Sequence, residues 1–417
     1  MQMKKNLVFW ALAAALLLLT VVMVGFMFYP SVREGCDFDL RVNEIHCVLE
    51  RCDPFDVWSE QVDRPPYYSY ARPDQASATR TKCVNAYPPW AYLMGYPFAA
   101  LPRPLGWFVY LGLNLCALLL LGVAGYRYAK ARLPEPSGAR IVAAAAVLLI
   151  ALACGSCYQS GNYPILVLLA TLGMVWCLDR RHDVLAGFCW ALAMIKPQLA
   201  LLFAVPLLWR RKYLTCAVAA LTCVIASVPA MVLCRRGFVE LVRHGIGGSS
   251  CAFMGCGTFP GFLCPLVGQS CGILVGLAVG AALCVFLTVR TPRSADWFVF
   301  ITPAALIATG WTYSQLYNSV MAWFFFVLIL IALVREPQNR TLRMLAVLSA
   351  LTVARPYTFL HGFLMLCPAR FNYSFELHWW IDSVGMLLSL VVFSWFWLLF
   401  SRMPAAVFRR RFDTCCD

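Results

Sequence analysis

Charged residues are scarce in this chain of 417 residues, and acidic residues are the scarcer kind. Only 13% of the residues are charged and 61% are hydrophobic, with a mean hydropathy of +0.72. A soluble domain carries about 25% charged residues, so this composition excludes an ordinary soluble domain and indicates a membrane protein. The formal net charge of +14 does not indicate a nucleic-acid binder, because the basic residues stand in twos and threes between apolar segments.

Motifs that bind nucleotides or metals are missing as well. The sequence contains neither a P-loop nor a dinucleotide-binding G-x-G-x-x-G, and its 5 histidines never show the H-x-x-x-H spacing of a zinc-binding helix. We therefore expect neither a cofactor nor a metal ion.

Long apolar segments recur along the whole chain. A membrane-spanning helix needs roughly 20 apolar residues, and Lys and Arg favour cytoplasmic loops. With the N-terminus in the cytoplasm, every inner loop holds at least two basic residues. The sequence therefore predicts an all-α polytopic protein of the cytoplasmic membrane, with one membrane domain over residues 1–417 and about twelve transmembrane or re-entrant helices. These are residues 7–29, 104–126, 141–157, 162–178, 184–195, 197–209, 213–234, 271–289, 297–314, 317–334, 342–360 and 381–401.

Three of these segments need a comment. The segments on either side of Lys196 are too short for ordinary crossing helices, so we expect tilted half-spans or a re-entrant pair that is buried in protein. The first segment follows Lys4 and Lys5. Its apolar run is long for a secretory signal and lacks an A-x-A cleavage site, which favours a retained signal anchor.

Two long segments, residues 30–103 and 235–270, lie on the extracytoplasmic side in this arrangement. Residues 39–51 predict a short helix on the membrane surface, which ends at the turn Asp53-Pro54-Phe55. Each long segment holds an even set of cysteines, in a compartment where disulfides persist, and bound zinc is the alternative. The sets are Cys36, Cys47, Cys52 and Cys83, and Cys251, Cys256, Cys264 and Cys271.

An ordered set of short motifs resembles a known family. The set begins with D-L-R-V at 39–42, D-P-F at 53–55 and Y-P-P at 87–89. Gly161-Asn162 opens a later apolar segment, and the longest piece is A-G-F-C-W-A-L-A-M-I-K-P-Q at 186–198, with L-L-W-R-R-K after it. Together these motifs resemble the membrane glycosyltransferases of family 87.

This resemblance implies a GT-C fold. It also implies transfer of a sugar, often mannose or arabinose, from a polyprenyl-phosphate donor to a lipid or glycan acceptor on the extracytoplasmic face, with inversion. An acidic residue in the first outer loop is the general base of that fold. By position this role falls to Asp39, with Asp37 as the alternative. Asn43 and Asn162 stand where the family often has an aromatic residue and Gln, which leaves the sugar and the acceptor open.

An inverting transfer also needs a cation that holds the leaving phosphate. Lys196 is the strongest candidate, because an ionisable group at membrane depth is costly unless it is used; a lysine that snorkels to water is the alternative. Arg355 and Arg243 are further candidates for the donor phosphate. The candidates for the substrate are Gln198, Asn162, Tyr313, Gln315 and His244, and those for stacking on a sugar ring or anchoring at the interface are Tyr67, Tyr68, Tyr87, Trp90, Tyr313 and Trp379.

Two other classes of membrane protein compete with this prediction. A secondary transporter usually shows two related halves with matching broken helices. Here the large first loop and the K-P-Q break at 196–198 have no counterpart in the second half, which favours the enzyme. The second alternative is a polymerase or ligase of surface glycans, which would take an oligosaccharide.

Overall fold

The computed structural model describes residues 7–15, 18, 21, 37–54, 87–153, 162–250, 259–311 and 316–354, with six positions between 391 and 398. Within these residues the protein is helical, without a β-strand. Three helices are long and apolar enough to cross a membrane: α5 (Arg103–Lys130), α12 (Tyr213–Cys234) and α15 (Gln269–Arg290). This finding supports the membrane protein that the composition predicted.

Shorter apolar helices lie in the other predicted segments that the structure describes. Five of them pack against the three long helices, and whether each one crosses a membrane stays a prediction, as does the total of twelve. They are α6 (Pro136–Ala153), α8 (Pro164–Asp179), α9 (Asp183–Ala193), α16 (Trp297–Ala308) and α17 (Trp323–Arg335). Helix α18 (Arg340–Ala354) packs against α6 and α17.

The chain is broken around Lys196, as the short segments on its two sides predicted. Helix α9 ends at Ala193, and α10 (Pro197–Ala200), a 3-10 turn η3 (Leu201–Phe203) and α11 (Ala204–Trp209) follow. Pro197 has no N–H for a continuous helix. Tryptophan indoles bond backbone carbonyls on both sides of the break: Trp90 donates to the Met194 carbonyl at 2.7 Å and Trp311 to the Gln198 carbonyl at 2.7 Å.

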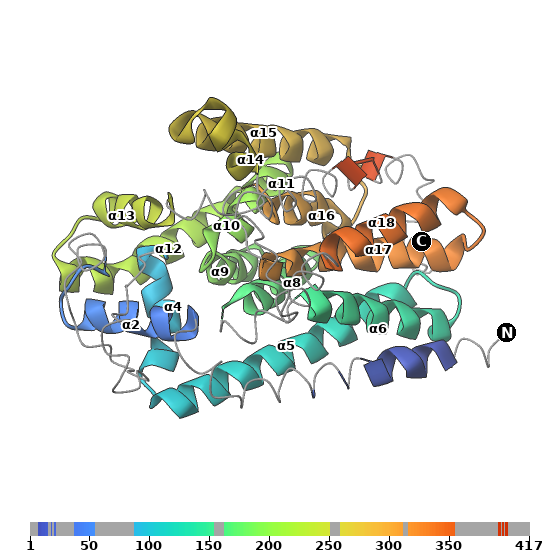
Figure 1. Ribbon diagram of the computed structural model, residues 1–417, viewed down its shortest axis with the longest axis horizontal. Helices are drawn as coiled ribbons and strands as arrows, with labels where there is room; N and C mark the ends of the chain where they lie inside the picture. Colours follow the sequence, from blue (N-terminus) through green and yellow to red (C-terminus); the bar gives the residue numbers. More distant parts are fainter. Residues whose placement is uncertain are drawn as a thin grey trace, which may run out of the picture.

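One end of the molecule gathers the basic helix termini, and we call it the basic end. Arg132 after α5 forms an ion pair with Asp296 before α16 and accepts a hydrogen bond on its carbonyl from Arg335 of α17. Lys212 pairs with Asp183 at 2.8 Å, which joins the starts of α9 and α12. Figure 1 shows the ends of α5 and α17 on the same side of the protein. The contacts therefore hold several predicted inner loops together.

The opposite end, which we call the α2 end, is built from three shorter helices. They are α2 (Asp37–Leu49), α4 (Pro89–Ala99) and α13 (Phe238–Ser250), and α4 packs against the other two and against α12 (Figure 1). Helix α14 (Phe259–Val267) then packs along α15. The second long segment of the sequence therefore contains two helices.

A helix forms where the sequence predicted one. Helix α2 has several side chains that are buried in protein, and its position at a membrane surface stays a prediction. Arg41, Asn43 and Glu44 are buried as fully as Val42 and Val48. Arg51, with a φ of 63°, ends the segment just before Asp53. The side chains of Arg41, Asn43 and Glu44 therefore face protein groups.

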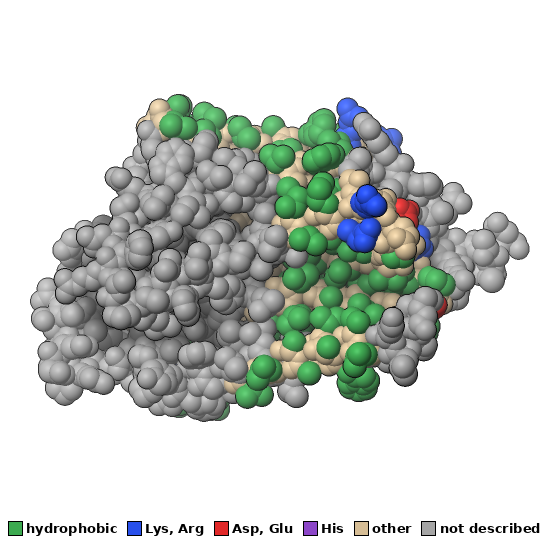
Figure 2. Space-filling model, turned by 45° about the vertical axis from the view of Figure 1, so that its right-hand side comes forward, with side chains coloured by type: hydrophobic (Ala, Val, Ile, Leu, Met, Phe, Trp, Pro, Cys, Tyr) green, Lys and Arg blue, Asp and Glu red, His purple; other side chains and the backbone are tan. Residues whose placement is uncertain are grey.

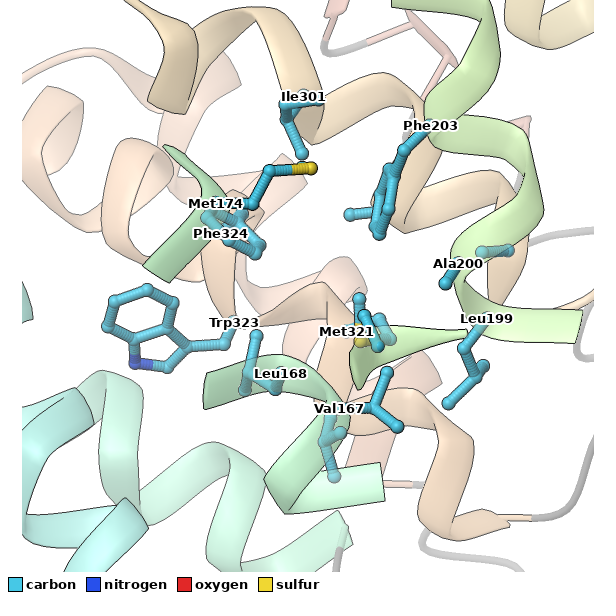
Figure 3. Packing of buried hydrophobic residues seen from close by; sticks show 14 of the residues in the cluster. Val167, Leu168, Met174, Leu199, Ala200, Phe203, Ile301, Met321, Trp323 and Phe324 are labelled. Carbon is cyan, nitrogen blue, oxygen red and sulfur yellow. The ribbon is translucent and has the colours of Figure 1, made fainter. Parts of the chain in front are cut away.

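An aromatic and aliphatic core joins the two ends. Figure 3 shows Val167 and Leu168 of α8, Leu199 of α10 and Phe203 of η3 together with Met321 of a second 3-10 turn, η5 (Leu316–Ala322). All of these side chains are buried. The core fixes α10, and with it the position of Lys196, against the first turns of α8.

The surface of the long helices is apolar. Leu119, Leu221 and Leu274 are each at least 60% exposed, and they lie on α5, α12 and α15. Figure 2 shows hydrophobic side chains across the middle of the described surface and basic side chains at one border of this band. Such a large exposed apolar area is typical of a surface that faces lipid.

Candidate functional site

The α2 end contains a buried ion pair. Nη1 of Arg41 lies 2.7 Å from Oε1 of Glu44, and the two side chains are only 6% and 1% exposed. The guanidinium carbon of Arg41 also lies 4.4 Å from the centre of the Tyr87 ring. Taking two charges out of water costs several kcal/mol per ion, so this pair needs a close and well-fixed environment.

That environment includes Asn162, which the sequence analysis predicted as a substrate-binding residue. Its Oδ1 accepts a hydrogen bond from the Tyr87 hydroxyl at 2.9 Å and another from the Tyr163 N–H at 2.9 Å. The Tyr110 hydroxyl of α5 donates to its backbone carbonyl. The Y-P-P and Gly-Asn motifs, 75 residues apart in the sequence, therefore meet in one network.

A second acid joins the network from the D-P-F motif. Oδ2 of Asp53 lies 2.8 Å from Nδ1 of His244 on α13, and the Asp53 side chain is almost fully buried. A Cβ on Gly245 would lie 3.2 Å from the Tyr87 carbonyl oxygen, so α13 approaches this segment closely. The two contacts of α13, from His244 to Asp53 and from Gly245 to Tyr87, bring these residues close together.

Tyr92 of α4 lies near the carboxylates of both Glu44 and Asp53. Its hydroxyl donates to the Tyr87 carbonyl at 3.4 Å. Burial raises the pKa of Tyr92 well above its usual value, and the carboxylates of Glu44 and Asp53 raise it further, with Arg41 acting in the opposite direction. Tyr92 is therefore a neutral hydrogen-bond donor at physiological pH, near both acids.

Two polar groups in this region have no hydrogen-bond partner among the residues that the structure describes. They are the side-chain amide of Asn43, which is 3% exposed, and the hydroxyl of Tyr163, which is 2% exposed. An unsatisfied buried polar group costs about 1–3 kcal/mol. Sugar hydroxyls are the kind of group that can satisfy an amide and a phenol, so both residues are candidates for substrate contact.

The two predicted bases lie at the start of α2. Asp37 is the first residue of the helix, and Asp39 stands one turn before Asn43. Whether Asp39 or Asp37 is the base stays a prediction.

Lys196, the predicted phosphate ligand, is 1% exposed at the break before α10. A snorkelling lysine would reach water with its ammonium group, so this burial excludes that alternative. Trp90, which joins α4 to the Met194 carbonyl, ties the break to the α2 end. A lysine this deep in an apolar protein is a candidate for holding a buried anion.

The remaining predicted residues differ in burial, and some lie outside the described residues. Gln198 is half-buried, with its carbonyl bonded to Trp311, and Arg243 is exposed beside His244 on α13. The rings of Tyr87 and Trp90 are packed in protein, and Trp90 stacks on Phe238 at 6.3 Å. Several candidates lie outside the described residues, namely Arg355, Tyr313, Gln315, Tyr67, Tyr68 and Trp379.

Sequence reasoning missed Arg41, Glu44, Asp53 and Tyr163. The signal for the first two was an Arg and a Glu three positions apart in a helix whose other residues are largely apolar, a spacing that favours an ion pair. Asp53 was interpreted as part of a helix-ending turn. Its partner His244 lies 191 residues away, so no local pattern revealed the pair.

The cysteines of the two long segments predicted disulfides, with bound zinc as the alternative. Within the described residues, no group of three His, Cys, Asp or Glu side chains is placed to hold a metal ion. Cys52 and Cys271 are free thiols within the described residues, and the pairing of the cysteines in the two long segments stays a prediction. Cys36, Cys83, Cys251 and Cys256 lie outside the described residues.

The comparisons with known proteins point to one family. Residues 85–247 match the model of glycosyltransferase family 87. This match confirms the resemblance that the short motifs indicated, and it indicates glycosyltransferase activity in general. The matched segment contains Tyr87, Asn162, Lys196 and His244. No curated protein and no solved structure matches the chain.

Proposed function

We propose that this membrane glycosyltransferase moves a mannose-like or arabinose-like sugar from a polyprenyl-phosphate donor to a lipid or glycan acceptor, with inversion. The proposal places the reaction at the α2 end, on the extracytoplasmic face of the cytoplasmic membrane, with a GT-C fold. The observation that carries it is the buried polar network of Arg41, Glu44, Tyr87 and Asn162. Such groups are expensive inside an apolar protein unless a substrate uses them.

In this mechanism Asp39 is the general base. Its carboxylate takes the proton of an acceptor hydroxyl while the hydroxyl oxygen forms a bond to the anomeric carbon of the sugar. The bond from that carbon to the donor phosphate breaks on the opposite side, so the configuration inverts. The polyprenyl phosphate leaves with the bonding electrons and one more negative charge.

Lys196 binds the leaving phosphate in this proposal. Its ammonium group offers a fixed positive charge in a site from which water is largely excluded, where such a charge is worth most. Arg243 and Arg355 are further candidates for the donor phosphate. No residue needs to hold a divalent cation if the lysine neutralises the phosphate.

The buried network has a positioning role. Glu44 and the Tyr87 ring hold the Arg41 guanidinium, and Asn162 holds the Tyr87 hydroxyl. Asn43 and Tyr163 then offer an amide and a hydroxyl to the sugar, while Gln198, Tyr313, Gln315 and His244 are further candidates for substrate contact. A site of this composition suits a neutral, hydroxyl-rich ligand.

A donor panel tests the proposal. Purified protein in lipid nanodiscs is given labelled polyprenyl-phosphate monosaccharides, and transfer is followed for the wild type, Asp39→Asn and Asp37→Asn. The two variants remove the same charge two residues apart, so each is the control for the other. We expect turnover with at least one donor and a loss of about 100-fold or more in Asp39→Asn alone.

Two results would contradict the proposal. If no donor is bound or consumed, the polyprenyl-phosphate assignment fails, and a transport assay with the same sugars follows. If Asp37→Asn alone loses turnover, the base is Asp37. An oligosaccharide acceptor that is extended by whole repeat units would identify a polymerase or ligase.

A further inference from the structure

A basic pocket lies at the basic end, in the turn between α11 and α12. It has a volume of about 550 Å³ and is lined by Trp209, Arg210, Arg211, Lys212, Arg293 and Trp297. Its lining contains four cations and no carboxylate. Small-molecule sites have volumes of about 300–1,000 Å³, so the pocket is large enough for an anionic group.

Two of the four cations are used by the protein itself. Lys212 forms the 2.8 Å ion pair with Asp183. Arg210 donates to the carbonyls of Arg293 at 2.7 Å and Ala295 at 2.5 Å, and its guanidinium carbon lies 3.8 Å from the centre of the Phe300 ring. Burial lowers the pKa of Arg210 to about 10, so it stays protonated at neutral pH. These two residues shape the pocket.

The other two cations keep an uncompensated charge. Arg211 and Arg293 are exposed, and neither forms an ion pair within the described part of the chain. The guanidinium carbon of Arg293 lies 5.6 Å from the centre of the Trp209 ring, which holds it over the pocket wall. A guanidinium group matches the geometry of a phosphate and binds it through two parallel hydrogen bonds.

The pocket borders the apolar surface of α12. Tyr213, the first residue of this helix, is 61% exposed, and Leu208 and Leu214 on its two sides are about half exposed. Exposed Leu221 and Ile225 continue the apolar face about two and three turns further. Aromatic residues next to an apolar helix are typical of the boundary between acyl chains and headgroups. Basic side chains at the border of an apolar band are visible in Figure 2.

We propose that this pocket binds the headgroup phosphate of an anionic phospholipid, with Arg211 and Arg293 as its ligands. The acyl chains lie along the exposed face of α12. Basic pockets between membrane helices suit anionic headgroups, and each cation near the surface adds to the attraction. The proposal is independent of the sugar-transfer site, which lies at the α2 end.

The chain provides a matched control for this proposal. Arg181 follows α8 as Arg211 follows α11, and both have left-handed backbones, with φ of 62° and 58°. In both turns the N–H of the next residue bonds back to the carbonyl five positions earlier, from His182 to Cys177 and from Lys212 to Leu207. Arg180 and Arg181 lie at the basic end but do not line the pocket. Arg→Gln changes at these two positions therefore remove the same charge with the same backbone demands.

The experiment counts bound lipid on the purified full-length protein by native mass spectrometry. The protein in detergent is titrated with phosphatidylglycerol, with phosphatidylcholine and with inorganic phosphate. The proteins compared are the wild type, the double variant R211Q/R293Q and the control R180Q/R181Q. A melting curve of each shows that it is folded.

We expect the wild type and the control to retain phosphatidylglycerol in preference to phosphatidylcholine. The double variant R211Q/R293Q should bind phosphatidylglycerol about 30-fold more weakly, the effect of two cations near an anionic headgroup. Equal retention of both lipids by the wild type, or equal losses in both double variants, would overturn the proposal. Inorganic phosphate that displaces the lipid at equal concentration would overturn the assignment to a lipid.

Discussion

Charged side chains are buried at one end of the molecule and exposed at the other. At the α2 end the pair of Arg41 and Glu44 is almost fully withdrawn from water, and it touches Tyr87 in a network with Asn162. At the basic end Arg211 and Arg293 are exposed at the border of an apolar surface. Burial of charge needs a compensating gain, whereas exposed cations at a membrane border need none. The difference supports the proposals that sugar transfer takes place at the α2 end and that the basic end contacts lipid.

The largest expected effect concerns the buried ion pair. Glu44→Ala leaves Arg41 buried without its carboxylate, and breaking such a pair costs about 3–5 kcal/mol. Glu240→Ala breaks the pair of Arg236 and Glu240 on the same side of the molecule, where the side chains are 38% and 40% exposed. That change should cost about 0–1 kcal/mol. Melting in detergent should show a large shift for the first variant and almost none for the second, and equal shifts would remove the contrast between buried and exposed charge.

Lys196 gives the next largest effect. Lys196→Gln removes the buried cation that we assign to the leaving phosphate, and loss of one such group lowers kcat by about 100- to 1,000-fold. Lys130→Gln, at an exposed position at the end of α5, is the matched control and should transfer sugar at the wild-type rate. Single-turnover rates with a saturating donor measure the chemical step. A Lys196→Gln enzyme with normal turnover would show that this lysine only stabilises the fold.

Trp90 connects the α2 end to the break at Lys196. Trp90→Phe keeps a ring but removes the N–H that bonds the Met194 carbonyl, and the unsatisfied carbonyl should cost about 1–3 kcal/mol. If this contact positions Lys196, kcat should fall more than the melting temperature predicts. Rescue of kcat by a lower assay temperature alone would indicate a purely structural role.

The smallest expected effect comes from the hydroxyl of Tyr87. Tyr87→Phe removes its hydrogen bond to Asn162 and should cost about 1 kcal/mol, with a rise in KM for the donor or the acceptor. Tyr96→Phe on the neighbouring helix α4 is the control, because Tyr96 is 44% exposed. Equal KM values for the two variants would place the Tyr87 network outside the substrate site.

Much of the helical framework followed from the sequence. The predicted segment at 213–234 is α12 to the residue, because the basic W-R-R-K cluster and Arg235 bound an uninterrupted apolar run. The break at Lys196 was also predicted, since the proline in K-P-Q cannot continue a helix. Apolar length and Pro are local signals, and they determine helix positions in a membrane protein.

The site was harder to predict. Lys196 and Asn162 could be named as candidates, because a lone charge in an apolar run and a motif next to a helix are visible in the sequence, and their roles stay predictions. The burial of Arg41 and Glu44 was not predicted, because it depends on the packing of α2 against α4, which begins at Pro89, and against α12. The contact of Asp53 with His244 joins two segments 191 residues apart. Such long-range packing leaves no local pattern.

Photo-crosslinking of a polyprenyl-phosphate sugar tests the central claim most directly. A donor analogue with a photoreactive group on the sugar is bound to the wild-type protein in nanodiscs and irradiated. The crosslinked residues are then identified by peptide mass spectrometry. We expect crosslinks at the α2 end, in residues 37–54, 87–95 and 162–163, that an excess of unlabelled donor removes. Crosslinks that gather instead at residues 209–213 and 293 would contradict the assignment, because the donor would then occupy the basic pocket.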